Sequence, residues 1–230
     1  MSGGVDSSAA AAKLLEGGHE VTGVTLRLLD SPTDSGCCSI DDVEDARRCA
    51  AALGIDHHVF NLAAEFSEKV IDPYVRAHME GSTPNPCIEC NRHLKFDHLL
   101  EASRRLGFDR LATGHHARVI DGPMGPELRR GHDSAKDQSY VLSMLSPLQL
   151  ASIVLPVGEM TKAEVRALAE RAGLLTAHKA ESQDTCFIGS GIARRDFLAS
   201  RAELHPGEIV EEGSGEVVGE VAAVELVTLG

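Results

Sequence analysis

A glycine- and serine-rich segment, SGGVDSS at residues 2–8, has the composition that proteins use to hold phosphate groups. Glycines let backbone N–H groups approach phosphate oxygens closely, and serine hydroxyls add further donors. Residues 6–16 have the pattern of a helix, whose positive dipole end would face the anion. The segment is neither the Gly-Lys-Ser/Thr nucleotide loop nor the dinucleotide fingerprint, so a plain turn with a helix cap remains the alternative.

The cysteines offer a second kind of chemistry. Cys87 and Cys90 form a C-x-x-C pair, and Cys186 follows about a hundred residues later. Such a pair can be a metal ligand, a redox pair or a coincidence. A structural zinc site usually needs four ligands, often two such pairs, and only one pair is present. A sulfur-handling site needs one thiolate to carry sulfur and another to resolve a persulfide. Cys90 and Cys186 could do this if the fold brings them together.

Six motifs in a fixed order resemble one family. They are SGGVDSS at 2–8, TPNPC-x-x-CN at 83–91, LATGH at 111–115, RG-x-D-x-x-KDQSY at 130–140, LPVGE at 155–159 and DTCFIG at 184–189. The first resembles the loop of the ATP-pyrophosphatase (PP-loop) superfamily. The whole set resembles the tRNA-specific 2-thiouridylases (MnmA), over almost the entire chain.

The resemblance implies an activity and its catalytic residues. The family adenylates C2 of the wobble uridine in tRNA with ATP and then replaces the oxygen with sulfur, giving 2-thiouridine, AMP and pyrophosphate. Cys186 would carry the persulfide and Cys90 would resolve it, leaving a Cys90–Cys186 disulfide. The family also implies Mg²⁺ with the triphosphate, and a sulfur donor that is either a cysteine desulfurase or a sulfur-relay protein.

The same resemblance assigns the binding residues. The positions that match ATP contacts are Ser2, Gly3, Gly4, Val5, Asp6, Ser7, Leu26 and Gly114. The positions that match tRNA contacts are Asn85, Pro86, Cys87, Lys136, Asp137 and Gln138.

An iron–sulfur site is the alternative use of the thiols. Cys87, Cys90 and Cys186 could be three ligands of a cluster that leaves one iron open. Such a cluster would bind or activate sulfide, and no persulfide on Cys186 would then be needed.

The elements that must position these residues alternate between helix and buried strand. Strands are expected at 20–29, 57–62 and 109–113, and helices at 40–53, 64–80, 92–106 and 162–172. Two prolines predict an irregular loop at 81–91, and 139–145 and 147–153 read as helical pieces. This alternation predicts an α/β fold, a Rossmann-like parallel sheet with helices on both faces (adenine nucleotide alpha hydrolase-like). Short β-like runs from 206 onward predict the start of a small β-rich domain, giving domains 1–196 and 197–230.

Composition narrows the classes of protein. The 230 residues carry a formal net charge of −13, of which residues 197–230 hold seven Glu and one Arg. This argues against a general nucleic-acid binder. No apolar run is long enough to span a membrane, and no signal peptide is present, so we expect a cytoplasmic monomer.

The two ends depart from the family pattern. Family members begin with a hydrophobic strand before the 2–8 loop, and continue after Gly230 into a β-barrel; we expect this chain to lack both. We therefore expect weak tRNA binding and little or no thiolase activity. Two other functions stay open: a different ATP-pyrophosphatase ligase or amidotransferase, which would not need both Cys90 and Cys186, and a non-catalytic iron–sulfur or tRNA-binding fragment.

Overall fold

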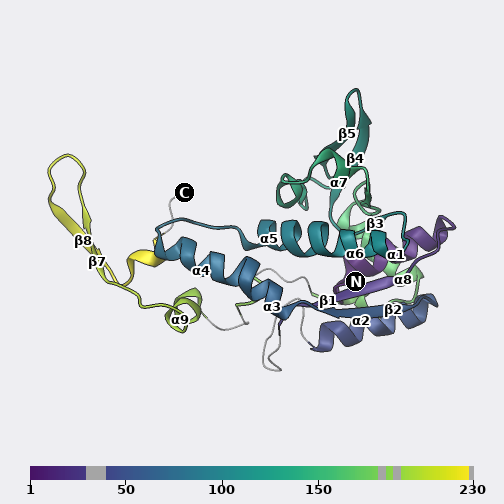
Figure 1. Ribbon diagram of the computed structural model, residues 1–230, viewed down its shortest axis with the longest axis horizontal. Coiled ribbons are helices and arrows are strands. Elements are labelled where there is room, and N and C mark those ends of the chain that lie inside the picture. The colour runs from purple at the N-terminus through teal and green to yellow at the C-terminus, as the bar shows by residue number, and fades with distance from the viewer. Residues whose placement is uncertain (30–39, 181–184, 189–192, 228–230) are drawn as a thin grey trace.

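The structure is a computed structural model that describes residues 1–29, 40–180, 185–188 and 193–227. The loop predicted at 30–38 and its neighbour Ser39 lie outside the described residues, as do Cys37 and Cys38. Figure 1 shows an elongated body with a hairpin projecting near each end.

Helical segments hold more of the described residues than strands do. The α-helices are α1 Val5–Glu16, α2 Ile40–Leu53, α3 Ala63–Phe66, α4 Asp72–Met79, α5 Pro86–Glu89, α6 Leu100–Arg105, α7 Pro147–Leu150, α8 Lys162–Arg171 and α9 Arg194–Ala199. The π-helical segments are η1 Ser67–Ile71 and η2 Cys90–Leu99, and the 3-10 segments are η3 Ser139–Leu142, η4 Leu175–His178 and η5 Val224–Leu226. The helix predicted at 162–172 is α8, and a capping box starts it, since the side chains of Thr161 and Glu164 accept from each other's backbone amides.

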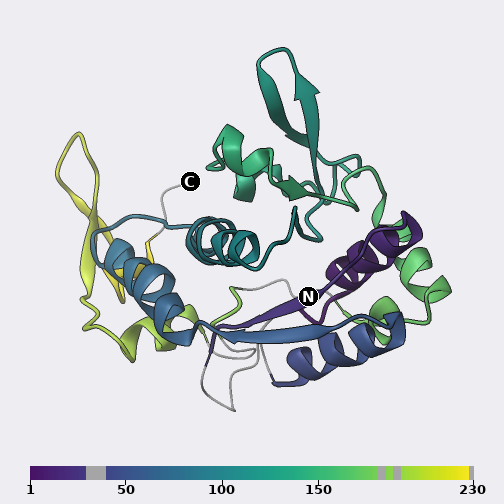
Figure 2. The same cartoon turned by 45° about the vertical axis from the view of Figure 1, so that its right-hand side comes forward.

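Strands pair in two parallel and two antiparallel ladders. They are β1 Gly23–Arg27, β2 His57–Asn61, β3 Leu111–Ala112, β4 Ala117–Gly122, β5 Gly125–Arg130, β6 Ile153–Val154, β7 Gly207–Val210 and β8 Val217–Val221. β1 runs parallel to β2 and β3 parallel to β6, while β4–β5 and β7–β8 are hairpins. In Figures 1 and 2, α2 lies against one face of the β1–β2 pair, as the predicted α/β arrangement requires.

The parallel strands form two separate pairs among the described residues, whereas one continuous sheet was predicted. Residues 1–4 occupy the place beside β1. The Met1 amine donates to the Val24 carbonyl, and Thr25 Oγ1 donates to the Met1 carbonyl at 2.6 Å. Because residues 1–4 are not a strand, β1 has no ladder on that edge.

Two sequence predictions need correction. Residues 86–91 are helical, because Pro86 occupies the first turn, where proline costs no hydrogen bond. The α5, η2 and α6 segments then run without a break from residue 86 to 105. Residues 147–153 are not one helix either: α7 ends at Leu150, and the β-branched pair at 153–154 forms β6.

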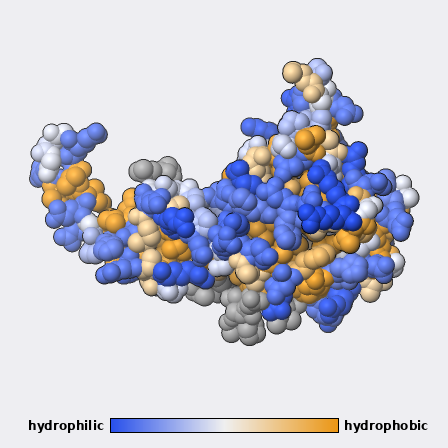
Figure 3. Space-filling model, viewed as in Figure 1, coloured by the Kyte–Doolittle hydropathy of each residue, from blue (hydrophilic) through white to orange (hydrophobic). Residues whose placement is uncertain are grey.

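Three clusters of buried apolar side chains form the core. One joins α1 to α8, a second lies around α3, η1 and α4, and a third lies under the β4–β5 hairpin. The β7–β8 hairpin stands at the opposite end from β4–β5 and exposes apolar side chains, visible in Figure 3. These are Ile209, Val210, Val217 and Val218.

Candidate active site

The loop at residues 2–8 folds as a turn that feeds directly into α1. Gly4 is the residue before the helix and has an extended backbone. Its carbonyl accepts from the hydroxyls of Ser7, at 3.1 Å, and Ser8, at 2.8 Å. The Ser7 hydroxyl also accepts from the backbone amide of Ser2 at 3.0 Å. The serines therefore fix the turn, and the first-turn amides of α1, which have no intrahelical acceptor, point out of the helix end.

Glycine is required on both sides of this loop. Gly3 has φ +70°, and a Cβ there would lie 2.3 Å from the Asp42 carbonyl oxygen on α2. A Cβ on Gly114, just after β3, would lie 2.5 Å from the carbonyl carbon of Asp6 and 2.6 Å from the amide nitrogen of Ser7. The start of α2 and the segment after β3 thus pack closely against the loop from two directions.

Asp6 is held by two side chains from distant parts of the chain. Lys162 Nζ lies 2.8 Å from each carboxylate oxygen, and His116 Nε2 lies 3.2 Å from Oδ1. Burial alone would raise the pKa of Asp6, but the hydrogen bonds from His116 and Lys162 outweigh it and lower the pKa below its ordinary value. The Asp6 carboxylate, in the first turn of α1, is therefore held in place by Lys162 and His116.

His115 adds a buried ring beside this anchor. Its Nδ1 lies 2.8 Å from Thr113 Oγ1, and its ring packs against Phe96 with centroids 6.2 Å apart. Burial, with a smaller contribution from the charge of Lys95, lowers the pKa of His115 well below its ordinary value. The ring is thus neutral near neutral pH and can serve as a hydrogen-bonding group rather than as a cation.

The C-x-x-C pair lies on the first turns of the long helix 86–105. Asn85 caps this helix, since its Oδ1 accepts from the Cys87 amide at 3.0 Å. Cys87 is exposed, while Cys90, one turn later, is buried and starts the π-helical segment η2. π-helical turns occur often at functional sites. The three residues matched to tRNA contacts, 85–87, thus form a helix cap rather than a flexible loop.

Cys186 lies in a tight turn against the same core cluster that contains Cys90. The turn is closed by the Ile188 amide, which donates to the Thr185 carbonyl at 2.9 Å. Cys186 is half-buried and packs on the cluster, together with Leu26 near the end of β1. The fold therefore brings the surroundings of the two candidate catalytic thiols together, as the sulfur-handling hypothesis requires.

The segment 136–138, matched to tRNA contacts, sits at the base of the β4–β5 hairpin. Gln138 exchanges two hydrogen bonds with the His116 backbone, both 2.9 Å long. Asp137 accepts from the Gly131 amide at 2.9 Å and from the Ser139 hydroxyl at 2.8 Å. Burial would raise the pKa of Asp137, but these bonds outweigh it and lower the pKa. The side chains of Asp137 and Gln138 thus accept hydrogen bonds from nearby backbone amides. Through its bonds to the His116 backbone, Gln138 also links this segment to the residue that contacts Asp6.

With this geometry in place, comparison with known proteins decides the family. Residues 1–190 match the profile of the tRNA methyl transferase HUP domain. The chain belongs to this family. The expected α/β fold class is thereby confirmed, together with the resemblance to the 2-thiouridylases.

Curated relatives of this HUP-domain chain share its sequence throughout. It is 48% identical over 224 residues to the tRNA-specific 2-thiouridylase MnmA of Acidothermus cellulolyticus, covering 95% of this chain and 61% of the relative. Identity is 48% over 235 residues with the MnmA of Mycobacteroides abscessus, covering 100% and 64%. With that of Sorangium cellulosum it is 49% over 236 residues, covering 100% and 61%. The chain thus spans about two thirds or less of the length of these relatives.

Solved structures were compared as well. A chain described as a predicted subunit of tRNA methyltransferase from Methanocaldococcus jannaschii has a TM-score of 0.43 at 20% identity, covering 74% of this chain and 72% of that one. The NMN synthetase of Francisella tularensis has a TM-score of 0.47 at 17% identity, covering 86% and 69%.

Sequence reasoning missed several residues of the HUP-domain site. Lys162 was noted only as the start of a helix, and no role was attached to His116, although both hold Asp6. Asn91, next to Cys90, is also buried: its Nδ2 donates to the Val141 carbonyl at 3.3 Å, and its Oδ1 has no partner in the part of the chain that the structure describes. Only the position of Asn91 inside the TPNPC-x-x-CN motif could have signalled it.

Metal ligands and membrane helices were searched over residues 1–29, 40–180, 185–188 and 193–227. No three His, Cys, Asp or Glu side chains among them lie close enough together to hold a metal ion. Cys87, Cys90 and Cys186 as arranged here therefore do not fit an iron–sulfur cluster. Within the same residues, no helix is long and apolar enough to cross a membrane.

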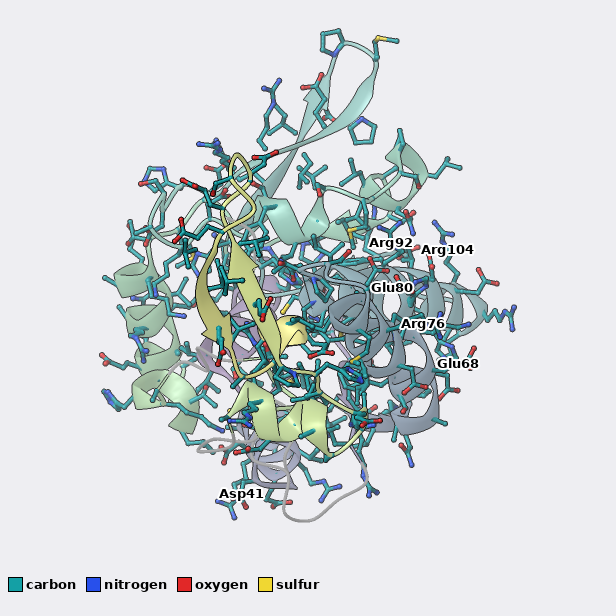
Figure 4. The ribbon with its side chains drawn as sticks, turned by 90° about the vertical axis from the view of Figure 1, so that its left-hand side faces the viewer. Asp41, Glu68, Arg76, Glu80, Arg92 and Arg104 are labelled. Atoms are coloured by element: carbon teal, nitrogen blue, oxygen red, sulfur yellow. The ribbon has the colours of Figure 1, made fainter. Side chains whose placement is uncertain are left out.

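Charged side chains gather on the outer side of the two long helices. Figure 4 shows Glu68, Arg76 and Glu80 on the η1–α4 helix and Arg92 and Arg104 on the 86–105 helix, all on one side of the molecule. This side is mixed in sign. It therefore lacks the uniformly positive surface typical of nucleic-acid binders.

Proposed function

We propose that this chain carries the catalytic part of a tRNA 2-thiouridylase. The observation that supports this most strongly is the identity of about 48% with curated enzymes of that name over almost all of its residues. The glycine loop at the start of α1 and the two thiols on one core cluster are the parts that such a reaction needs. We assign catalysis to residues 1–196 and place the start of a second domain at 197–230.

The first half of the reaction is adenylation. ATP would bind with its phosphates at the first-turn amides of α1, where the helix dipole and the glycines favour an anion. Gly114 would let the nucleotide approach from the β3 side, and Leu26 would lie on the adenine side. Mg²⁺ would enter on the triphosphate, because both Asp6 oxygens already contact Lys162.

Sulfur transfer follows. The terminal sulfur of a persulfide on Cys186 forms a bond to C2 of the uridine, and AMP leaves with the oxygen that had been bonded to C2. The Cys90 thiolate then attacks Sγ of Cys186 and breaks its bond to the transferred sulfur. The base keeps that sulfur as a thiocarbonyl, and a Cys90–Cys186 disulfide remains, which a thiol reductant must reduce before the next turnover.

The partners follow from this reaction. The substrate would be tRNA, contacted by residues 85–87 and 136–138, and a cysteine desulfurase or a relay protein would load Cys186. The protein would act in the cytoplasm as a monomer. Asn85, by capping the helix of Cys90, would link base recognition to the position of the resolving thiol.

Mass spectrometry of tRNA nucleosides tests the proposal. The chain is incubated in excess over tRNA with ATP, Mg²⁺ and a persulfide donor, so that a single turnover can be followed. Cys90→Ser and Cys186→Ser should lower 2-thiouridine formation by about a thousandfold or more. Cys49→Ala is the control, since Cys49 is buried against Thr176 in another cluster and should change the yield by less than about twofold.

The outcomes separate the alternatives. Loss of product in both serine variants supports the thiolase. ATP-dependent AMP release with a small-molecule substrate that both serine variants retain would favour a different ATP-pyrophosphatase ligase. Visible absorption typical of an iron–sulfur cluster after anaerobic purification, lost in Cys87→Ser, would favour the cluster mechanism. Failure of the unmodified chain to form AMP from ATP with tRNA present would favour a non-catalytic fragment and contradict the proposal.

A further inference from the structure

An aromatic cage surrounds the residue that follows Cys186. The ring of Phe187 meets Tyr74 at 5.2 Å and 81°, Phe197 at 5.3 Å and 51°, and Phe66 at 5.8 Å and 70°, measured between ring centroids and planes. These distances and tilts fall in the range that aromatic pairs favour, and each such pair stabilises the packing beyond the effect of burial alone. Phe187 is therefore fixed by three rings at once.

The three partner rings come from separate parts of the fold. Phe66 ends α3, Tyr74 lies on α4 and Phe197 lies on α9, and Phe66 and Tyr74 are almost fully buried. Phe187 is 6% exposed. Among the described residues of its own segment, 185–188, the one regular backbone bond is that between Ile188 and Thr185. Three rings from separate elements thus pack against the middle of this short turn.

Cys90 belongs to the same core cluster as the cage. The cluster contains Phe66, Tyr74, Cys90 and Phe187 as buried members, and Cys186 packs against it. A ring fixed in the cluster fixes the backbone next to it, and so the Cβ of Cys186. We propose that Phe187 is a positioning residue that holds Cys186 within reach of Cys90. This inference rests on the proposed function, because it concerns the same pair of thiols.

The chemistry that reports this positioning is disulfide exchange with glutathione. Glutathione disulfide oxidises the two thiols in two exchange steps: its S–S bond breaks, one Cys90–Cys186 bond forms, and two molecules of glutathione leave with the two protons and two electrons. The equilibrium constant of this exchange is an effective concentration of one thiol near the other. It falls when Cys186 can move away from Cys90.

The experiment measures this effective concentration in the full chain by mass spectrometry of alkylated peptides, in glutathione buffers of known ratio. All proteins carry Cys87→Ser, so that the neighbouring thiol cannot compete. Phe187→Leu keeps an apolar side chain but removes the ring contacts, and we expect the effective concentration to fall about tenfold. Leu168→Ala is the matched control, because Leu168 is equally buried in the separate α1–α8 cluster. Its expected change is less than about twofold.

Three results would overturn the inference. The first is a Phe187→Leu value within about twofold of the parent protein, and the second is a parent that forms no Cys90–Cys186 disulfide. The third is an equal fall in Leu168→Ala, which would show a general loosening of the fold; denaturant unfolding of both variants measures that loosening directly. The exchange needs neither ATP nor tRNA. A chain that shows the predicted exchange but forms no AMP from ATP with tRNA present would therefore contradict the proposed function and leave this inference standing.

Discussion

The glycine loop and the cysteine region are held in place by different forces. At the loop, Asp6 is fixed by Lys162 and His116, and buried hydroxyls of Ser8 and Thr176 bond each other at 3.1 Å. At the cysteines, the ring of Phe187 contacts the rings of Phe66, Tyr74 and Phe197 inside a cluster of apolar side chains. One region is held by charges and hydroxyls, and the other by apolar packing.

This difference matches the chemistry proposed for each region. A site for phosphate needs exposed amides and carries unmatched positive charge, so charged side chains from distant elements can hold it without blocking it. A persulfide is soft and poorly hydrated, and apolar side chains around it can keep water away while they hold the thiols in position. The loop region should therefore respond to pH and to lost charges, whereas the cysteine region should respond to lost volume.

The largest test of the loop's tight packing is Gly114→Ala. A methyl group there would meet the backbone of Asp6 and Ser7 at 2.5–2.7 Å, and backbone cannot move aside as a side chain can. We expect unfolding free energy to fall by about 3 kcal/mol and ATP affinity by about tenfold or more. Gly213→Ala is the control, since nothing lies within 4 Å of the added methyl. Denaturant unfolding measures the free energy of unfolding, and calorimetric titration measures ATP affinity. If Gly114→Ala and Gly213→Ala gave equal values of both, the close contact at Gly114 would be contradicted.

Lys162→Met tests whether charge holds the loop. It leaves the Asp6 carboxylate with His116 alone, and we expect a loss of about 2 kcal/mol in unfolding free energy and about tenfold in ATP affinity. Lys179→Met is a matched control, because Lys179 also bridges two carboxylates, those of Asp42 and Asp45. Because Lys179 is more exposed than Lys162, its replacement should lower the free energy of unfolding by about 1 kcal/mol and change ATP affinity less. Equal ATP affinities in the two variants would remove the special role of Lys162.

Much of the local structure was predictable from the sequence. The Thr161–Glu164 capping box, the β4–β5 hairpin and the ends of α2 and α8 follow from residue types a few positions apart. Gly54 and Gly173, which follow those two helices, have positive φ as expected. The error at Pro86 is also local: proline was taken as a helix breaker, but after the capping side chain of Asn85 it starts one.

The long-range contacts were not predictable in the same way. Lys162 and Asp6 are 156 residues apart, and the Phe187 cage joins four segments; no spacing rule in a single sequence connects such positions. The motifs marked where chemistry would occur, but the groups that hold those motifs lie outside them. This explains why the loop and the cysteines were found from sequence while Lys162, His116 and Phe197 were not.

A smaller effect than that of Lys162→Met is expected from acid, which should lower the free energy of unfolding through Asp6. The folded-state pKa of Asp6 lies below its ordinary value of 3.8, so the stability that it contributes is present above about pH 4 and is lost as pH falls through the folded pKa. We expect Asp6→Asn to lower unfolding free energy at pH 6 by about 1–2 kcal/mol and to flatten its decline below about pH 4. Urea unfolding across this range measures it. If unfolding free energy fell with pH as steeply in Asp6→Asn as in the unmodified chain, the decline would come from other carboxylates.

The smallest effect comes from a polar contact at the cysteine-side end of the molecule. His205 Nδ1 lies 2.8 Å from the buried carboxylate of Glu225, whose backbone carbonyl contacts His78 Nδ1 at 3.1 Å. The hydrogen bond to Glu225 raises the pKa of His205, so its contribution is fully present below about pH 6.5 and is lost as pH rises through the folded pKa.

His205→Asn should therefore remove a small decline in stability as pH rises above about 6.5, opposite in direction to the decline caused by Asp6. The exchange equilibrium of Cys90 with Cys186 should not change, because Phe187 and its three partner rings carry no titrating contact with His205. Urea unfolding at several pH values and the glutathione assay measure the two quantities on the same protein. A change in the exchange equilibrium would mean that charge, and not only apolar packing, holds the cysteine region.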